Sequence, residues 1–301
     1  MKQYVIIITL ISTLLGGSSC KEWLKVDSED RIMEDALFQS ESGFFTALNG
    51  VYVHLLNTNL YGRTLTAGTF DILAQYYDTT KPLNSHTYRS LANFELQAKK
   101  DAVADTWKEA YFLIANINTI LEHCENDRSV LSESNYELIK GECLALRAML
   151  HFEMFRIFGP IYSYEPGKVC IPYSDDTEKN VKPLLSAIDV VDKILTDLNQ
   201  AENLLLNVDP VITKGPQSSA EGNNRLRYRN LRLNYFAVQA LTARVYLYAG
   251  NTTEAGRYAR KVISGASKFF PFATREQVNG QAATGTVNRE AEDRIFSSEV
   301  L

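Results

Sequence analysis

The stretch "IKGECLALRAMLHFEMFRIFGPI", residues 139–161, is the most informative segment of the sequence. Apolar residues fall on most sides of a helix drawn over it, so the spacing predicts a helix over residues 132–158 that is buried in the interior of a helical body. Gly159 and Pro160 follow, and neither residue supports a further helical turn. The segment therefore predicts one long central helix with a defined end.

Two charged residues, Glu142 and Arg147, lie inside this apolar pattern. A buried charge without a partner is strongly unfavourable, so each of them is expected to form an ion pair within the fold. A catalytic carboxylate at Glu142 is the alternative. The chain carries 36 acidic residues, however, so one carboxylate in this position is weak evidence for catalysis. We predict a structural role.

Helical patterns continue along most of the chain, with Gly, Pro and Asn gathered between them, which predicts an all-α fold. At the start of the central helix, Ser134 and Glu137 have the spacing of a capping box, and Ser132 is the alternative N-cap. Residues 207–230 and the chain beyond Pro271 are predicted to be surface loops. The other predicted helices span residues 42–55, 69–77, 101–123, 184–206, 231–248 and 253–264.

Residues 240–262, "ALTARVYLYAGNTTEAGRYARKV", predict a pair of antiparallel helices joined at Gly250 and Asn251. Small residues at Ala243 and Ala255 let two helices approach closely, and Tyr246 fills the space beside them. The spacing is similar to one tetratricopeptide unit. No second copy of equal clarity is present in the sequence.

The N-terminus has the layout of a secretory signal, with Lys2 before an apolar run over residues 5–15 and small residues before Cys20. The run is shorter than the roughly 20 residues that cross a bilayer. The small residues before Cys20 resemble a bacterial lipobox, in which this cysteine would carry acyl chains that anchor the protein. Ordinary secretion is the alternative. The expected segments are a signal peptide over 1–19, an acylated tether over 20–41 and a helical domain over 42–301.

Composition excludes several classes of protein. The formal net charge is −5 and hydrophobic residues make up 45% of the chain, which predicts a folded, mildly acidic body. Cys124, Cys143 and Cys170 show no CxxC spacing, so neither a disulfide framework nor a zinc site is indicated. Cys143 and His151 are expected to be buried in the central helix. We predict no metal and no cofactor.

Four arginines form a basic cluster in the second half of the chain. In an acidic, exported protein, contacts with nucleic acid are a poor explanation for it. We interpret the cluster as solvated loop charges or as contacts with a partner protein. Its members are Arg225, Arg227, Arg229 and Arg232.

The central helix resembles the GExxxLRAxxxFxxxRxFGP signature of the SusD/RagB family of nutrient-binding outer-membrane lipoproteins. Cys143 stands where a small residue such as Ala is usual. Further segments resemble the family in the same order along nearly the whole chain. The signature is supplied here by Gly141, Glu142, Leu146, Arg147, Ala148, Phe152, Arg156, Phe158, Gly159 and Pro160.

The resemblance implies a superhelical body of tetratricopeptide-like hairpins with long irregular loops that bind a ligand. It also implies a lipid-anchored protein on the cell surface, held to the outer membrane, which passes glycans to a SusC-like, TonB-dependent transporter. Members of the family usually continue beyond this length, and "RIFSSEVL" at the end resembles a segment from their middle. We therefore expect the helical domain to be incomplete at its C-terminus.

The best candidate for a glycan site is the segment from residue 61 to residue 90, because sugars bind to exposed aromatic rings beside hydrogen-bonding side chains. The alternative is that Tyr76 and Tyr77 pack against the end of the second helix. Trp107 is assigned to packing. The candidate ligand-binding residues are Tyr61, Tyr76, Tyr77, Asp78, Asn84, Tyr88 and Arg89.

A second loop, residues 159–176, is a weaker candidate, with Tyr162, Tyr164, Tyr173 and Asp175. No GxSxG, HExxH or Walker pattern is present, so we expect a non-catalytic protein. Three alternatives stay open. The protein could bind peptides in place of glycans, it could be a glycoside hydrolase with two carboxylates beside a cleft, or it could be a scaffold without a small ligand.

Overall fold

Helix α7, Glu133–Phe158, runs through the middle of the protein, as the sequence predicts. The computed structural model describes residues 34, 36–78, 88–95, 100–217 and 226–272. Every residue from 141 to 155 is buried, including the charged ones. A helix buried on all sides needs neighbours on all sides, and the other long helices supply them.

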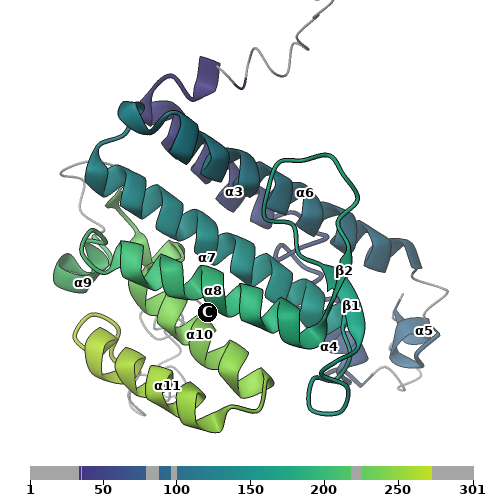
Figure 1. The fold of residues 1–301 in the computed structure, drawn as a ribbon. Coiled ribbons are helices and arrows are strands. Elements are labelled where there is room, and N and C mark those ends of the chain that lie inside the picture. Colours follow the sequence, from purple (N-terminus) through teal and green to yellow (C-terminus); the bar gives the residue numbers. More distant parts are fainter. Residues whose placement is uncertain (1–33, 35, 79–87, 96–99, 218–225, 273–301) are drawn as a thin grey trace, which may run out of the picture.

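The long helices form three layers, which Figure 1 shows from top to bottom. The first holds α3, Glu41–Leu55, and α6, Lys100–Asn126. The second holds α7 and α8, Ala187–Leu205, and the third holds α10, Tyr235–Tyr248, and α11, Thr252–Ala266. A single hydrophobic core runs through these layers, from Phe44 in α3 to Val245 in α10. The prediction of an all-α fold of helical pairs is confirmed.

Helix α7 begins at Glu133, one residue after its N-cap Ser132, whose side chain makes no capping bond. The hydroxyl of Ser132 lies 3.2 Å from a carboxylate oxygen of Glu41 and donates to it. The predicted capping box of Ser134 and Glu137 is therefore wrong, because both residues already lie inside the helix. A contact with α3 takes the place of the local cap.

A small antiparallel sheet, which the sequence did not predict, is added to the helical body. Strand β1, Val169–Pro172, pairs with β2, Leu184–Ser186, which directly precedes α8. Val169 lies opposite Ser186, and the register shifts between Val169 and Ile171. The predicted helix over 184–206 therefore begins only at Ala187, where Ser186 caps it by accepting a bond from the N–H of Asp189.

The predicted surface loop over residues 207–230 is partly structured and partly buried. It contains the short helix α9, Val211–Lys214, and the 3-10 helix η4, Arg229–Leu231. The side chains of Asp209, Val211 and Arg229 are buried, so this segment contributes to the interior. The predicted helix over 231–248 begins at Tyr235 instead, after Asn234 caps it.

The predicted helical pair near the end of the described chain is confirmed as the hairpin of α10 and α11. Gly250 joins them with a φ of 80°, a left-handed backbone that glycine adopts without strain. Tyr246 stacks on Tyr258 with ring centroids 5.7 Å apart, and Ala255 is buried at the interface. The tetratricopeptide-like spacing therefore predicted a real pair of packed helices.

A small unit lies beside the main body, at the right of Figure 1. It consists of α4, Thr69–Leu73, and α5, Arg89–Ala92, whose buried residues Ile72 and Leu91 form a separate small core. Helix α4 ends four residues earlier than predicted, because Gln75 adopts a left-handed backbone with a φ of 63°. This unit carries the candidate glycan-binding segment.

Candidate functional site

The aromatic residues that follow α4 are exposed to solvent. The side chain of Tyr76 is 77% exposed, Tyr77 is about half exposed, and Asp78 beside them is also exposed. Packing against the helix therefore does not account for Tyr76. Exposed aromatic rings next to a carboxylate suit a sugar as ligand, since such rings can cover its C–H faces and a carboxylate can accept bonds from its hydroxyls.

A well-defined turn holds these residues in place. The N–H of Tyr76 donates to the carbonyl oxygen of Asp71 at 3.1 Å, and the N–H of Gln75 donates to that of Ile72 at 3.0 Å. This pair of bonds is the Schellman ending of a helix, with Gln75 at the position that is usually glycine. The side-chain amide of Gln75 donates to the carbonyl oxygen of Ala92 at 2.9 Å, which ties α4 to the end of α5.

The other predicted members of this site are divided between surface and core. Arg89 is exposed at the start of α5, whereas Tyr88 is half-buried and packs on the small core of Ile72 and Leu91. Tyr88 therefore supports the unit. Asn84 lies outside the described residues.

Tyr61 belongs to the main body. Its ring is half-buried against the main core, and burial raises the pKa of its hydroxyl well above the usual value, with the carboxylate of Glu153 adding to the shift. The structure does not group it with the exposed pair at Tyr76.

Sequence reasoning missed one exposed aromatic residue of the small unit. Phe94 follows α5 and is 61% exposed. Its sequence context, "SLANFELQ", carries no glycine or proline, so the pattern predicts neither the short helix α5 nor the turn that follows it.

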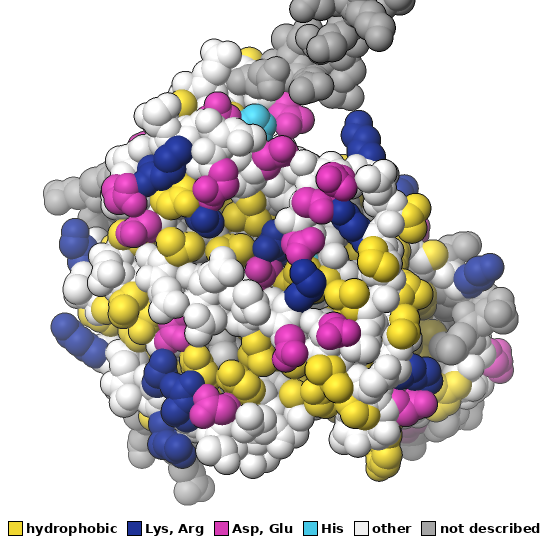
Figure 2. Space-filling view, in the orientation of Figure 1, with side chains coloured by type: hydrophobic (Ala, Val, Ile, Leu, Met, Phe, Trp, Pro, Cys, Tyr) yellow, Lys and Arg dark blue, Asp and Glu magenta, His cyan; other side chains and the backbone are white. Residues whose placement is uncertain are grey.

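The second candidate loop supplies fewer exposed groups than predicted. Tyr164 is 81% exposed, but Tyr173 is buried, and its hydroxyl donates to Asp197 at 2.6 Å. Placing Tyr173 in a ligand site is therefore wrong. Asp175 is exposed and pairs with Lys193 at 2.7 Å. Hydrophobic side chains gather beside β1 and β2 in Figure 2, whereas acidic and basic side chains intersperse across the middle of that face.

Arg147 is the centre of a buried polar network. Its guanidinium donates two bonds to the carboxylate of Asp197, at 2.7 and 2.8 Å, and a third to the amide oxygen of Asn118 at 3.0 Å. It also donates to the backbone oxygen of Asp175, and Asn118 donates to that of Asp176. The network therefore joins α6, α7 and α8 and anchors the loop that follows β1.

His151 completes the anchor of that loop. One ring nitrogen, Nδ1, lies 2.9 Å from the backbone oxygen of Arg147, and Nε2 accepts a bond from the N–H of Ser174 at 3.0 Å. This pattern requires a neutral ring that carries its proton on Nδ1. Burial lowers the pKa of His151 to about 3, and the nearby Arg147 charge acts in the same direction.

Glu142 belongs to a second buried network. It accepts a bond from the hydroxyl of Tyr52 at 2.7 Å and pairs with the guanidinium of Arg229. Arg229 also makes two bonds to the carboxylate of Asp209, at 2.9 and 2.8 Å. Asp209 in turn accepts a bond from the backbone N–H of Tyr235 at the start of α10. Glu142 is therefore a structural residue, as predicted.

The interpretation of the basic cluster as solvated charge is wrong for Arg229. Its side chain is 1% exposed and forms the ion pairs with Glu142 and Asp209. Arg232 is half-buried, with its guanidinium 4.3 Å from the centre of the Tyr52 ring. Arg225 lies outside the described residues.

The remaining signature residues serve packing. A Cβ atom at Gly141 would lie 2.8 Å from Cγ of Leu205, so glycine allows α7 and α8 to approach closely. Phe152 is buried, and Arg156 pairs with Glu153 at 2.9 Å. Gly159 caps α7 directly before Pro160. Trp107 packs edge-on against Phe158 with ring centroids 4.9 Å apart, which confirms its assignment to packing.

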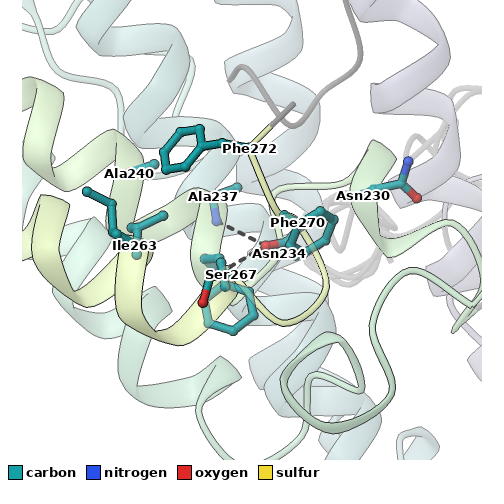
Figure 3. Close-up of a pocket in the computed structure, with 11 residues that line it drawn as sticks. Asn230, Asn234, Ala237, Ala240, Ile263, Ser267, Phe270 and Phe272 are labelled. Carbon is teal, nitrogen blue, oxygen red and sulfur yellow. Dashed lines mark hydrogen bonds between the residues drawn. The ribbon is translucent and has the colours of Figure 1, made fainter. Parts of the chain in front are cut away.

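A pocket of about 130 Å³ lies between α10 and α11, and Figure 3 shows the side chains around it. Ala240, Ile263, Phe270 and Phe272 make its walls mainly apolar. The amide oxygen of Asn234 already accepts bonds from the first N–H groups of α10. The pocket therefore suits an apolar group better than a sugar.

The described part of the chain shows neither a cluster of metal ligands nor a membrane-spanning helix. Within it, no group of three or more His, Cys, Asp or Glu side chains is placed to hold a metal ion. No helix there is long and apolar enough to span a membrane.

Stacked helical pairs around one buried helix, with exposed aromatics on a small unit at the side, define an all-α protein of the tetratricopeptide-like kind. The chain belongs to the SusD-like family described as starch-binding and associating with the outer membrane, whose pattern matches residues 22–222.

Two curated relatives come from Formosa agariphila. SusD-like protein P25 is 25% identical over 225 residues, which is 70% of this chain and 40% of the relative. SusD-like protein P38 is 27% identical over 210 residues, 68% of this chain and 39% of the relative. The chain thus spans about 40% of the length of these relatives.

Solved structures share the fold. A SusD superfamily protein from Bacteroides thetaiotaomicron matches with a TM-score of 0.64 and 20% identity, over 80% of this chain and 50% of the other. A putative sugar binding protein from Bacteroides vulgatus matches with a TM-score of 0.57 and 23% identity, over 82% of this chain and 51% of the other.

Proposed function

We propose that this protein is a non-catalytic, lipid-anchored protein of the outer membrane that binds glycans and passes them to a SusC-like, TonB-dependent transporter. The observation that carries the proposal is the exposed pair of Tyr76 and Tyr77 beside Asp78. The description of the family as starch-binding and associating with the outer membrane supports it.

Binding at this site involves non-covalent contacts and no chemical reaction of the ligand. An aromatic ring covers the apolar C–H face of a sugar, and the carboxylate of Asp78 accepts bonds from hydroxyl groups. Arg89 is an exposed residue of the same small unit, and a guanidinium can donate bonds to sugar oxygens. The ligand is held for transfer.

The buried carboxylates support a binding role over a hydrolytic one. A glycosidase needs two carboxyl groups beside its substrate, separated by about 5 to 9.5 Å. Glu142 and Asp209 are bonded to Arg229 in the interior. Asp197 is bonded to Arg147 in the same way, so all three serve the fold.

The proposed lipid anchor is Cys20, and it has a direct test. Cells that express the full chain would be fed labelled palmitate, with Cys20→Ala as the comparison. We expect label in the wild-type protein only, and a membrane fraction that holds the wild type but not the variant. Equal labelling of both proteins would contradict the assignment of Cys20.

The glycan site is tested by affinity electrophoresis of the chain from Lys21 through gels that contain starch, laminarin, xylan or pectin. We expect retention on at least one polysaccharide and loss of retention in Tyr76→Ala and Tyr77→Ala. Circular dichroism of the variants confirms that their helix content is unchanged. Retention on none of the polysaccharides would contradict the proposal.

A further inference from the structure

A second pocket, of about 330 Å³, opens on the main body between α6, α7, α8 and the loop that follows β1. Its volume falls in the range of roughly 300–1,000 Å³ that is usual for small-molecule sites. None of the described residues of α4 and α5 lines it. The pocket is therefore separate from the glycan site proposed on the small unit.

Arg147 lines this pocket and brings a buried hydrogen-bond donor to it. Its side chain is only 9% exposed, and a guanidinium carries five N–H donors. Four of them are bonded, two to the carboxylate of Asp197, one to the amide oxygen of Asn118 and one to the backbone oxygen of Asp175. The fifth, on Nη2, has no partner among the described residues. A buried donor of this kind favours a ligand that supplies an oxygen acceptor.

The ion pairs around the pocket leave one carboxylate over. Lys140 pairs with Glu125 at 2.6 Å, and Lys193 pairs with Asp175 at 2.7 Å. Two further pairs join Lys182 to Asp176 and Arg147 to Asp197. The remaining carboxylate of the lining is Glu122, which makes no ion pair within the described part of the chain.

The free carboxylate and the free N–H belong to one face of the pocket. Glu122 follows Asn118 by four residues on α6, so their Cβ atoms lie about 5–6 Å apart on the same side of the helix. Asn118 in turn is bonded to Arg147. Leu121 and Leu144 add hydrocarbon surface to the lining. The pocket thus offers an acceptor for a cation, a donor for an oxygen and an apolar surface within a short distance.

We infer that this pocket binds a small hydroxylated amine, with its ammonium group on the carboxylate of Glu122 and a hydroxyl oxygen on the free N–H of Arg147. An anionic ligand is disfavoured, because like charges repel and carboxylates outnumber cations in the lining. A neutral polyol would leave Glu122 without a counter-charge. The inference concerns a second ligand on the main body and does not depend on glycan binding at the small unit.

The test is a calorimetric titration of the chain from Lys21 at pH 6, where an amine is protonated, with three probes of similar size. Glucosamine carries the ammonium and the hydroxyl groups, glucose lacks the ammonium group, and cyclohexylamine lacks the hydroxyl groups. Charge-assisted hydrogen bonds are stronger than neutral ones. We therefore expect glucosamine to bind at least tenfold more tightly than either of the other probes.

The contact with Glu122 is tested by Glu122→Gln, with Asp192→Asn as the matched control. Asp192 is an exposed carboxylate of α8 that does not line the pocket. Both positions are exposed, so both variants are expected to fold. We expect Glu122→Gln to bind glucosamine at least tenfold more weakly and Asp192→Asn to bind it like the wild type.

Each contrary outcome removes a definite part of the inference. Equal binding of glucose and glucosamine would overturn the ammonium contact, and equal binding of cyclohexylamine would overturn the contact with Arg147. Unchanged affinity in Glu122→Gln, or no saturable binding of glucosamine to the wild type, would overturn the site itself. Loss of glucosamine binding in Tyr76→Ala would place the amine on the small unit and contradict a separate pocket.

Discussion

At the scale of residues, the charged members of the signature hold the fold together. Glu142 and Arg147 were predicted to need ion-pair partners, and both have them. The partners, Arg229 and Asp197, lie 87 and 50 residues further along the chain. Nothing in the local pattern identifies a partner at that distance, so the sequence predicts the need for a pair and only the fold reveals its members.

Removal of the Arg229 charge should strongly destabilise the protein. In Arg229→Met, the carboxylates of Glu142 and Asp209 would be buried without a counter-charge. We expect a loss of about 3–5 kcal/mol in the free energy of unfolding, measured with urea at pH 7. Arg128→Met, which breaks an exposed pair with Glu133, should lose less than about 1 kcal/mol. Similar losses in the two variants would contradict this assignment.

His151 should make stability depend on pH. Its pKa in the folded protein, about 3, lies below the roughly 6.5 of an unfolded chain, so the unfolded state takes up a proton that the folded state does not. The contribution of neutral His151 to the free energy of unfolding is complete above pH 6.5 and is lost as the pH falls from 6.5 towards 3. Between pH 7.5 and 5.0 the wild type should lose about 2 kcal/mol more than His151→Gln in urea unfolding. Parallel pH profiles for the two proteins would show that His151 does not titrate in this way.

At the scale of elements, sequence patterns located the long helices and missed the short irregular ones. Apolar residues at helical spacing extend over many turns in α3, α6 and α8, and α7 is a long apolar segment that ends at Gly159, so the positions of these helices were predictable. The strands β1 and β2 have four and three residues. Such short segments do not show a recognisable alternation of apolar and polar residues in the sequence. The early end of α4 depends on a left-handed Gln75, which the sequence does not mark with glycine.

The approach of α7 to α8 should depend on Gly141. An added methyl group there meets Leu205 at 2.8 Å, so Gly141→Ala is expected to lower the free energy of unfolding by about 1–3 kcal/mol. Gly50 in α3 is exposed and has open space around its Cα, so Gly50→Ala should raise it by about 0.5–1 kcal/mol. Urea unfolding of both variants gives the comparison. If both substitutions stabilised the protein, α7 and α8 would not be closely packed at Gly141.

At the scale of the whole molecule, three layers of helices form the main body, and the small unit of α4 and α5 lies beside it. The exposed Tyr76 and Tyr77 belong to that unit. The resemblance of the central helix predicted this body correctly. The site was predictable only in part. An aromatic-rich segment marked Tyr76 and Tyr77, whereas the burial of Tyr173 and the exposure of Phe94 follow from packing and turn geometry in the folded chain.

We predict that glycans bind at the small unit and not at the second loop. The most direct measurement is a calorimetric titration of the chain from Lys21 with the hexasaccharide of the retained polymer, comparing Tyr76→Ala with Tyr164→Ala. Both side chains are highly exposed, so neither substitution should disturb folding. We predict at least tenfold weaker binding for Tyr76→Ala and unchanged binding for Tyr164→Ala. Unchanged binding in Tyr76→Ala with a loss in Tyr164→Ala would place the site on the loop beside β1 and contradict glycan binding at the small unit.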